Sequence, residues 1–176
     1  MNRPTLEELD KIRNLGFRPQ VVGCFLYDKK ILFLFDKEYS LWQLPQGGID
    51  NNETVDYAFT REMTEELGQK FMKSVANQVT KLNIVCKDKI EFPSSTQNTR
   101  ELQNDKGDKL FMKGKIYFFV AVGSSIKDLD INETEFDDYK WVDFNEANAL
   151  TDEIYQRGKK RITANVLGTL KFLKFL

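Results

Sequence analysis

The chain has 176 residues, of which 41% are hydrophobic and 30% charged, a composition ordinary for one soluble globular domain. The charges of its 26 basic and 27 acidic side chains nearly cancel, which excludes an overall positive charge that would bind long nucleic acid. Because the chain contains no histidine, mechanisms that need a histidine base or metal ligand are excluded, and acid–base chemistry falls to carboxylates, lysine or tyrosine.

The chain also lacks an apolar run near the ~20 residues that span a bilayer. The charged stretch 1–12 has no apolar signal centre, so we expect a cytoplasmic protein without membrane contact. Cys24 and Cys86 lie apart in apolar runs, which favours buried free thiols over a disulfide. A monomer and a small homo-oligomer are both compatible with the sequence.

The first half of the chain contains a capping-box pattern, two apolar runs around a polar turn, and an amphipathic stretch. In chain order we predict a helix from Thr5 to near Gly16, strands over 21–27 and 31–35, an extended segment over 41–46, and a helix over 54–67. The predicted helix over 54–67 carries one apolar stripe, formed by Val55, Phe59, Met63 and Leu67. Gly68 suits a left-handed helix end.

The second half is predicted to complete a sheet and to end in helices. The predicted elements are a strand over 78–86, a polar excursion over 87–109, strands over 110–122 and 139–142, and helices over 144–150 and 154–176. The excursion fits a lid or binding segment as well as it fits a disordered surface insertion. This order predicts a single α/β or α+β domain over 1–176 with a mixed sheet.

Three glutamates stand together on the predicted helix 54–67. Glu62, Glu65 and Glu66 are spaced so that their carboxylates project from one face. Like charges at this spacing destabilise a helix by roughly 0.2–0.5 kcal/mol per pair, so a counter-ion is expected. Mg²⁺ takes oxygen ligands of this kind, and the alternative is a solvated acidic face.

The spacing from Gly47 through Glu53 and Arg61 to these glutamates and Gly68 fills every fixed position of the Nudix signature. The chain therefore resembles the Nudix hydrolases. The resemblance implies an α/β/α sandwich with a central mixed sheet and a loop–helix–loop catalytic motif. It also implies hydrolysis of a nucleoside diphosphate linked to another group, with a divalent metal, Mg²⁺ or Mn²⁺.

Roles for individual residues follow from the same resemblance. By position, Glu62, Glu65 and Glu66 match the metal-binding glutamates. Gly47 matches the residue whose carbonyl often joins them as a ligand. Glu53 and Arg61 match the pair that braces the loop against the helix.

Three further segments are similar to a subgroup, the RNA pyrophosphohydrolases and the asymmetric dinucleoside tetraphosphate hydrolases. They are the run 42–49 (Trp-Gln-Leu-Pro-Gln-Gly-Gly-Ile), the segment 17–19 (Phe-Arg-Pro), and the segment 135–141 that begins Glu-Phe-Asp. The last implies that Glu135 is a further metal ligand or base. The stretch 113–118 differs from the corresponding run of the subgroup. These segments do not separate the two activities, so the substrate is an RNA 5′ end or a dinucleoside polyphosphate.

Such a hydrolase needs a base and groups that bind phosphate. Glu66 or Glu135 would take the proton of the attacking water, and the sequence does not choose between them. Arg18 is a candidate phosphate contact, with a strand-edge surface charge as the alternative. Lys159 is another, although a solvated helix face is favoured for it.

Two competing functions remain beside this reading. One is a nucleoside triphosphate pyrophosphatase, against which the run 42–49 argues. The other is a non-catalytic Nudix ligand-binding domain. Such domains commonly lose signature glutamates, whereas this chain keeps them all and has no appended DNA-binding module.

Overall fold

The computed structural model describes residues 1–76, 82–97 and 99–176. Its helices are α1 (Leu6–Asn14), α2 (Val55–Leu67), α3 (Gln69–Ala76), the short 3-10 helix η1 (Ile131–Glu133), α4 (Phe144–Asp152) and α5 (Arg157–Phe172). Its strands are β1 (Phe17–Tyr27), β2 (Lys30–Asp36), β3 (Leu41–Gln43), β4 (Gln46–Gly48), β5 (Asn83–Glu91), β6 (Glu101–Gln103), β7 (Lys109–Phe111), β8 (Gly114–Gly123) and β9 (Asp138–Val142).

A mixed sheet forms the centre of the molecule. Its strand order is β3-β2-β1-β8-β5, with β4 paired to β1 and β9 paired to β2. β1 and β8 run parallel over ten residue pairs, whereas the other pairs are antiparallel. β6 and β7 form a separate two-stranded hairpin. The mixed sheet expected from the sequence is therefore confirmed.

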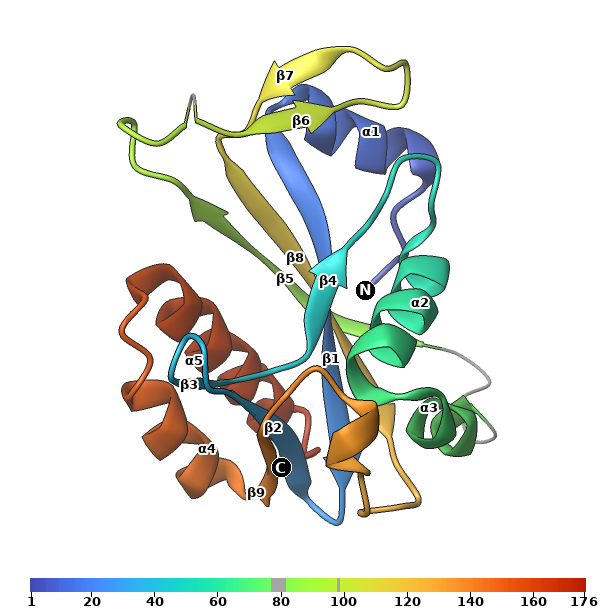
Figure 1. Cartoon of the computed structure of the whole chain (residues 1–176), viewed down its shortest axis with the longest axis vertical. Coiled ribbons are helices and arrows are strands. Elements are labelled where there is room, and N and C mark those ends of the chain that lie inside the picture. The colour runs from blue at the N-terminus through green and yellow to red at the C-terminus, as the bar shows by residue number, and fades with distance from the viewer. Residues whose placement is uncertain (77–81, 98) are drawn as a thin grey trace.

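Helices cover both faces of this sheet (Figure 1). On one face, α1, α2 and α3 bury the first apolar cluster, which includes Leu9, Val55, Phe59, Met63, Leu67 and Phe71. On the other face, α5 buries the second cluster, which includes Ile162, Val166, Leu167 and Leu170. Because strand side chains alternate, the residues of β1 and β8 supply both clusters. The result is the predicted α/β/α sandwich.

The first half of the chain follows the sequence prediction closely. Thr5 and Glu8 form both bonds of the capping box at the start of α1. All four residues of the predicted stripe on α2 are buried. Gly68 has a φ of +85° but an extended ψ of 150°, because α3 begins directly after it. α3 itself has no counterpart in the prediction.

The second half departs from the prediction around the polar excursion. β5 runs from Asn83 to Glu91. Of the strand predicted over 78–86, residues 78–81 lie outside the described residues. The sequence does not reveal residues 87–91 of β5 as a strand because most of them are charged. Charged residues are tolerated there because this strand at the edge of the sheet exposes one row of side chains to water. The excursion then folds into β6 and β7, and the predicted strand 110–122 is split between β7 and β8. α5 is shorter at both ends than predicted.

Both cysteines are free thiols, as the sequence predicts; Cys24 is buried as expected, whereas Cys86 is only half-buried. Among the described residues, no helix is long and apolar enough to cross a membrane.

Candidate functional site

The site begins at strand β4, which ends in two glycines, Gly47 and Gly48, shortly before α2. Thr54 caps α2 by accepting the Tyr57 N–H at 3.3 Å, and this fixes where the helix begins. Glu62 packs directly on Gly47, where a β-carbon would overlap its carboxyl group. On the next residue, a β-carbon of Gly48 would overlap the guanidinium of Arg18. The two glycines thus let an acidic and a basic side chain approach β4 from its two sides.

Glu66 lies one helical turn beyond Glu62 and is partly buried beside β4. Its carboxylate accepts the Gln46 N–H at 2.7 Å. The pKa of Glu66 is raised to about 8, mainly by burial and in addition by the negative charges of Glu135 and Glu62. The bond from Gln46 and the positive charge of Lys159 oppose this shift. The Glu135 N–H donates to the Glu66 carbonyl at 3.3 Å. The charges of Glu62 and Glu135 therefore both act on Glu66.

Glu65 is more exposed than Glu62 and Glu66. Its side chain is 56% exposed and lies 3.6 Å from the Arg61 guanidinium. Arg61 also holds Glu62 at 2.6 Å. Within residues 1–76, 82–97 and 99–176, no three carboxylate or thiol side chains converge closely enough to form a ready-made metal cage.

The chemistry of the donor set nevertheless fits a hard divalent cation. Glu62, Glu65, Glu66 and Glu135 offer carboxylate oxygens, the ligands that Mg²⁺ prefers. A carboxyl with a pKa near 8 lacks sufficient positive charge nearby, so a cation beside Glu66 would be stabilising.

Arg61 and Glu53 form the brace that the sequence predicts as a pair. The guanidinium donates to both Glu53 oxygens, each at 2.8 Å, and to the Gly48 carbonyl at 2.9 Å. Burial alone raises the pKa of Glu53, but the bonds from Arg61 and from the Asp50 N–H outweigh it and lower that pKa overall. The forked pair ties the start of α2's loop to the face that carries Glu62.

A group of basic side chains lies around β4, and one of them, Lys159, is close enough to Glu66 to influence its pKa. Arg18 and Lys115 are register partners on the parallel strands β1 and β8. Lys159, at the start of α5, donates to Gln43 Oε1 at 2.5 Å. Gln43, Gln46 and Lys159 line a small hollow between β3, β4 and α5. The structure thus brings both predicted phosphate contacts, Arg18 and Lys159, to the region of β4.

Lys115 belongs to this group and was missed by the sequence reasoning. Its pKa is lowered to about 8, mainly by burial and in addition by the positive charges of Arg18, Lys159 and Arg100. Strand alternation could have placed Lys115 on the same face as Tyr117 and Phe119. The register of β8 against β1, which brings it beside Arg18, leaves no local signal in the sequence.

Comparison with known proteins agrees with this geometry. The NUDIX domain family model matches residues 17–165. The RNA pyrophosphohydrolase of Saccharophagus degradans is 30% identical over 164 residues, covering 84% of this chain and 86% of the relative. That of Actinobacillus succinogenes is 28% identical over 154 residues, covering 82% and 73%.

Solved structures with the same fold are more distant in sequence. The E. coli dihydroneopterin triphosphate pyrophosphohydrolase has a TM-score of 0.59 at 18% identity, covering 86% of this chain and 97% of its own. A C. elegans Ap4A hydrolase complex has a TM-score of 0.52 at 16% identity, covering 92% and 99%. These likenesses support the fold. With the family match over most of its length, the chain belongs to the NUDIX domain family and is a Nudix hydrolase.

Proposed function

We propose that this Nudix hydrolase cleaves a phosphoanhydride bond of a nucleotide substrate with a divalent metal, Mg²⁺ or Mn²⁺. Glu62, Glu65 and Glu66 would hold the metal, together with Glu135 and the Gly47 carbonyl. The observation that carries this proposal is the coupling of Glu66 to Glu62 and Glu135 on one side and to Lys159 on the other. A bound metal of this kind lowers the pKa of a coordinated water and neutralises phosphate charge.

The protein side chains supply the remaining chemistry. Arg18, Lys115 and Lys159 bind phosphate oxygens and hold the substrate in line for attack. Glu66 or Glu135 accepts the proton of the attacking water. Glu53 and Arg61 support the site structurally by fixing the loop from which α2 begins.

The favoured substrate is the 5′-triphosphorylated end of an RNA. The names of the relatives support it, as does the run 42–49. A dinucleoside polyphosphate is the second candidate, since the same run occurs in both subgroups. The cytoplasmic location and the oligomeric state stay predictions.

A product assay tests this proposal. Triphosphorylated RNA, diadenosine tetraphosphate and ATP are incubated separately with the protein and Mg²⁺ or Mn²⁺, with a chelator as the control. Pyrophosphate released from RNA is the expected result. ATP plus AMP from the dinucleotide would assign the second substrate, and hydrolysis of ATP alone would assign a nucleoside triphosphate pyrophosphatase. Binding without hydrolysis of any substrate would contradict an enzymatic role.

Lys115 gives the activity a predictable pH dependence. With a pKa of about 8 in the free protein, the ammonium loses its proton at mildly alkaline pH. We expect kcat/KM to fall above pH 8 by about tenfold per pH unit, because phosphate contacts need the charged form. Lys115→Arg should keep its activity to higher pH, since arginine stays protonated. Steady-state rates from pH 6 to 10 measure this.

Loss of the proton from Lys115 does not itself destabilise the fold, whereas the raised thiol pKa values of Cys24 and Cys86 lower stability above about pH 9, so circular dichroism at each pH checks the fold. The unfolded chain keeps the Lys115 proton up to about pH 10.4, so between pH 8 and that value the unfolded state binds more protons. Lys115 therefore makes the folded protein more stable as pH rises through this window. An identical decline in wild type and Lys115→Arg would show that another group controls the profile.

A further inference from the structure

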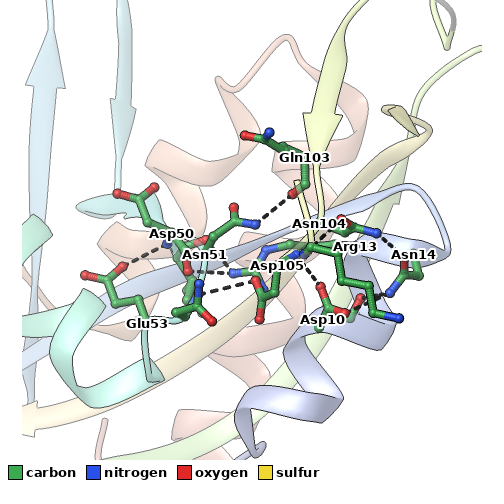
Figure 2. Close-up of polar contacts among 12 residues, drawn as sticks. Asp10, Arg13, Asn14, Asp50, Asn51, Glu53, Gln103, Asn104 and Asp105 are labelled. Atoms are coloured by element: carbon green, nitrogen blue, oxygen red, sulfur yellow. Dashed lines mark hydrogen bonds and ion pairs between the residues drawn. The ribbon is translucent and has the colours of Figure 1, made fainter. Parts of the chain in front are cut away.

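The turn between β6 and β7 is clasped to two other parts of the chain (Figure 2). Asn104 is buried and donates to Asn14 Oδ1 of α1 at 2.9 Å. The Asp105 N–H donates to Asp10 Oδ1 of α1 at 2.7 Å. Asn51 Nδ2, from the loop that precedes α2, donates to the Gln103 carbonyl at 3.2 Å. The hairpin that the sequence left as an excursion is thus fixed by its tip.

Arg13 of α1 stands at the centre of this clasp and is only 1% exposed. Its Nη1 donates to Asp105 Oδ1 at 3.1 Å. Its Nη2 donates to the Ile49 carbonyl at 3.0 Å and to the Asp50 carbonyl at 2.7 Å. A buried guanidinium is stable only when such partners satisfy it, so Arg13 and the loop hold each other in place.

The contacts continue from this loop to the acidic face of α2. The Asp50 carbonyl that Arg13 binds also accepts the Glu53 N–H at 3.2 Å. The Asp50 N–H in turn donates to Glu53 Oε2 at 2.8 Å. Glu53 forms the fork with Arg61, and Arg61 holds Glu62. An unbroken series of hydrogen bonds therefore joins Arg13 to a proposed metal ligand.

Asp105 supports the same loop from the opposite side. The carboxylate oxygen that receives Arg13 also accepts the Asn52 N–H at 3.3 Å. Asn52 has a φ of +59°, a left-handed conformation that asparagine adopts more readily than most other residues with a side chain. The tip of the hairpin thus bonds the loop at the residue where its backbone turns.

We propose that Arg13 is a positioning residue of this hydrolase, with Asp105 of the hairpin tip as its partner. Together they fix the loop 49–52, and through Glu53 and Arg61 they set the position of Glu62. This inference rests on the proposed metal site. It assigns residues 103–105, at the tip of the hairpin within the predicted excursion, a role in ordering that site from outside.

The test compares Arg13→Met and Arg13→Lys with a matched control, Asn14→Ala. The control removes the bond from Asn104 and the two bonds from Asn14 to Asp10, but it leaves in place the bonds that Arg13 and Asp105 make to the loop. Mn²⁺ affinity is measured on the protein alone by electron paramagnetic resonance, kcat and KM by the product assay, and order in the loop by hydrogen exchange of peptides covering 48–54.

In Arg13→Met we expect Mn²⁺ affinity and kcat to fall by about 10- to 100-fold, the range for residues that orient metal ligands. KM should change little, and exchange should quicken in 48–54 but not in α5. Arg13→Lys should recover part of both losses, because an ammonium can reach the two carbonyls. Asn14→Ala should keep wild-type kcat and Mn²⁺ affinity.

Wild-type kcat and Mn²⁺ affinity in a folded but less stable Arg13→Met would overturn the inference, because the clasp would then serve stability alone. Should that variant not fold, Asp105→Asn replaces it, with a loss of both quantities expected and wild-type values contradicting the inference. Glu62→Gln and Glu66→Gln distinguish a failure of the proposed metal site from a failure of the inference about Arg13. If they retain Mn²⁺ affinity, the proposed metal site is wrong; if only Arg13→Met retains it, the role of Arg13 alone is wrong.

Discussion

Glu66→Gln is expected to lower turnover by at least about 100-fold, the scale of losing general-base catalysis, while leaving the fold intact. The carboxylate sits between Gln46, Lys159 and the other acidic residues, so both metal binding and proton transfer depend on its charge. The amide keeps an oxygen that can accept the Gln46 N–H. Because the pKa of Glu66 is near 8, the metal-free protein already carries a largely neutral side chain there at pH 7.

Rates of pyrophosphate release from triphosphorylated RNA, with circular dichroism as the check on folding, measure this loss. Glu65→Gln is the comparison on the same helix. Its carboxylate is more than half exposed, so a smaller loss is expected. Equal losses in the two variants would contradict the central position given to Glu66, and wild-type turnover would remove it from the mechanism.

Arg61→Met should impair both stability and activity. It leaves the buried Glu53 carboxylate, 8% exposed, without its forked partner. Breaking a buried ion pair destabilises a protein by about 3–5 kcal/mol, and the 26% exposure of the Arg61 side chain places the expectation near 3 kcal/mol. Turnover should fall by about 10- to 100-fold, because Glu62 also loses its partner. Urea unfolding and the product assay measure the two effects.

Arg161→Met is the matched control. Arg161 also pairs with a carboxylate, Asp88, through one nitrogen that reaches both oxygens, but its side chain is 50% exposed. Exposed pairs contribute about 0–1 kcal/mol, so little stability should be lost and turnover should be unchanged. In the double variant Glu53→Gln/Arg61→Met, the loss should be less than the sum of the single losses, since the unpaired charge is gone. Additive losses would contradict the brace.

The acidic half of the site could be predicted because its information is local. The glutamates, Gly47, Glu53 and Arg61 lie within one turn and one helix, so their spacing alone brings them together. The order of the predicted elements indicated a mixed sheet with helices, and the resemblance to the Nudix hydrolases implied the α/β/α arrangement. Arg18 and Lys159 were recognised singly, without evidence that they share a region.

The remainder depends on contacts between distant segments. Lys115 joins Arg18 only through the parallel register of β1 and β8. The hairpin β6–β7 was hidden because its residues are polar and its tip is held by α1 and the loop before α2, not by an apolar face of its own. The sequence pattern does not single out Arg13, and only its three acceptors explain its burial.

The parallel pairing of β1 with β8 also has a consequence for how the protein is made. The strand at the middle of the sheet leaves the ribosome early, but its parallel neighbour follows roughly 100 residues later, and such distant pairings are typical of slow folding. Until then, β1 exposes an apolar edge that can pair with other chains. The nascent polypeptide is therefore most open to aggregation in the interval before residue 123 has been synthesised.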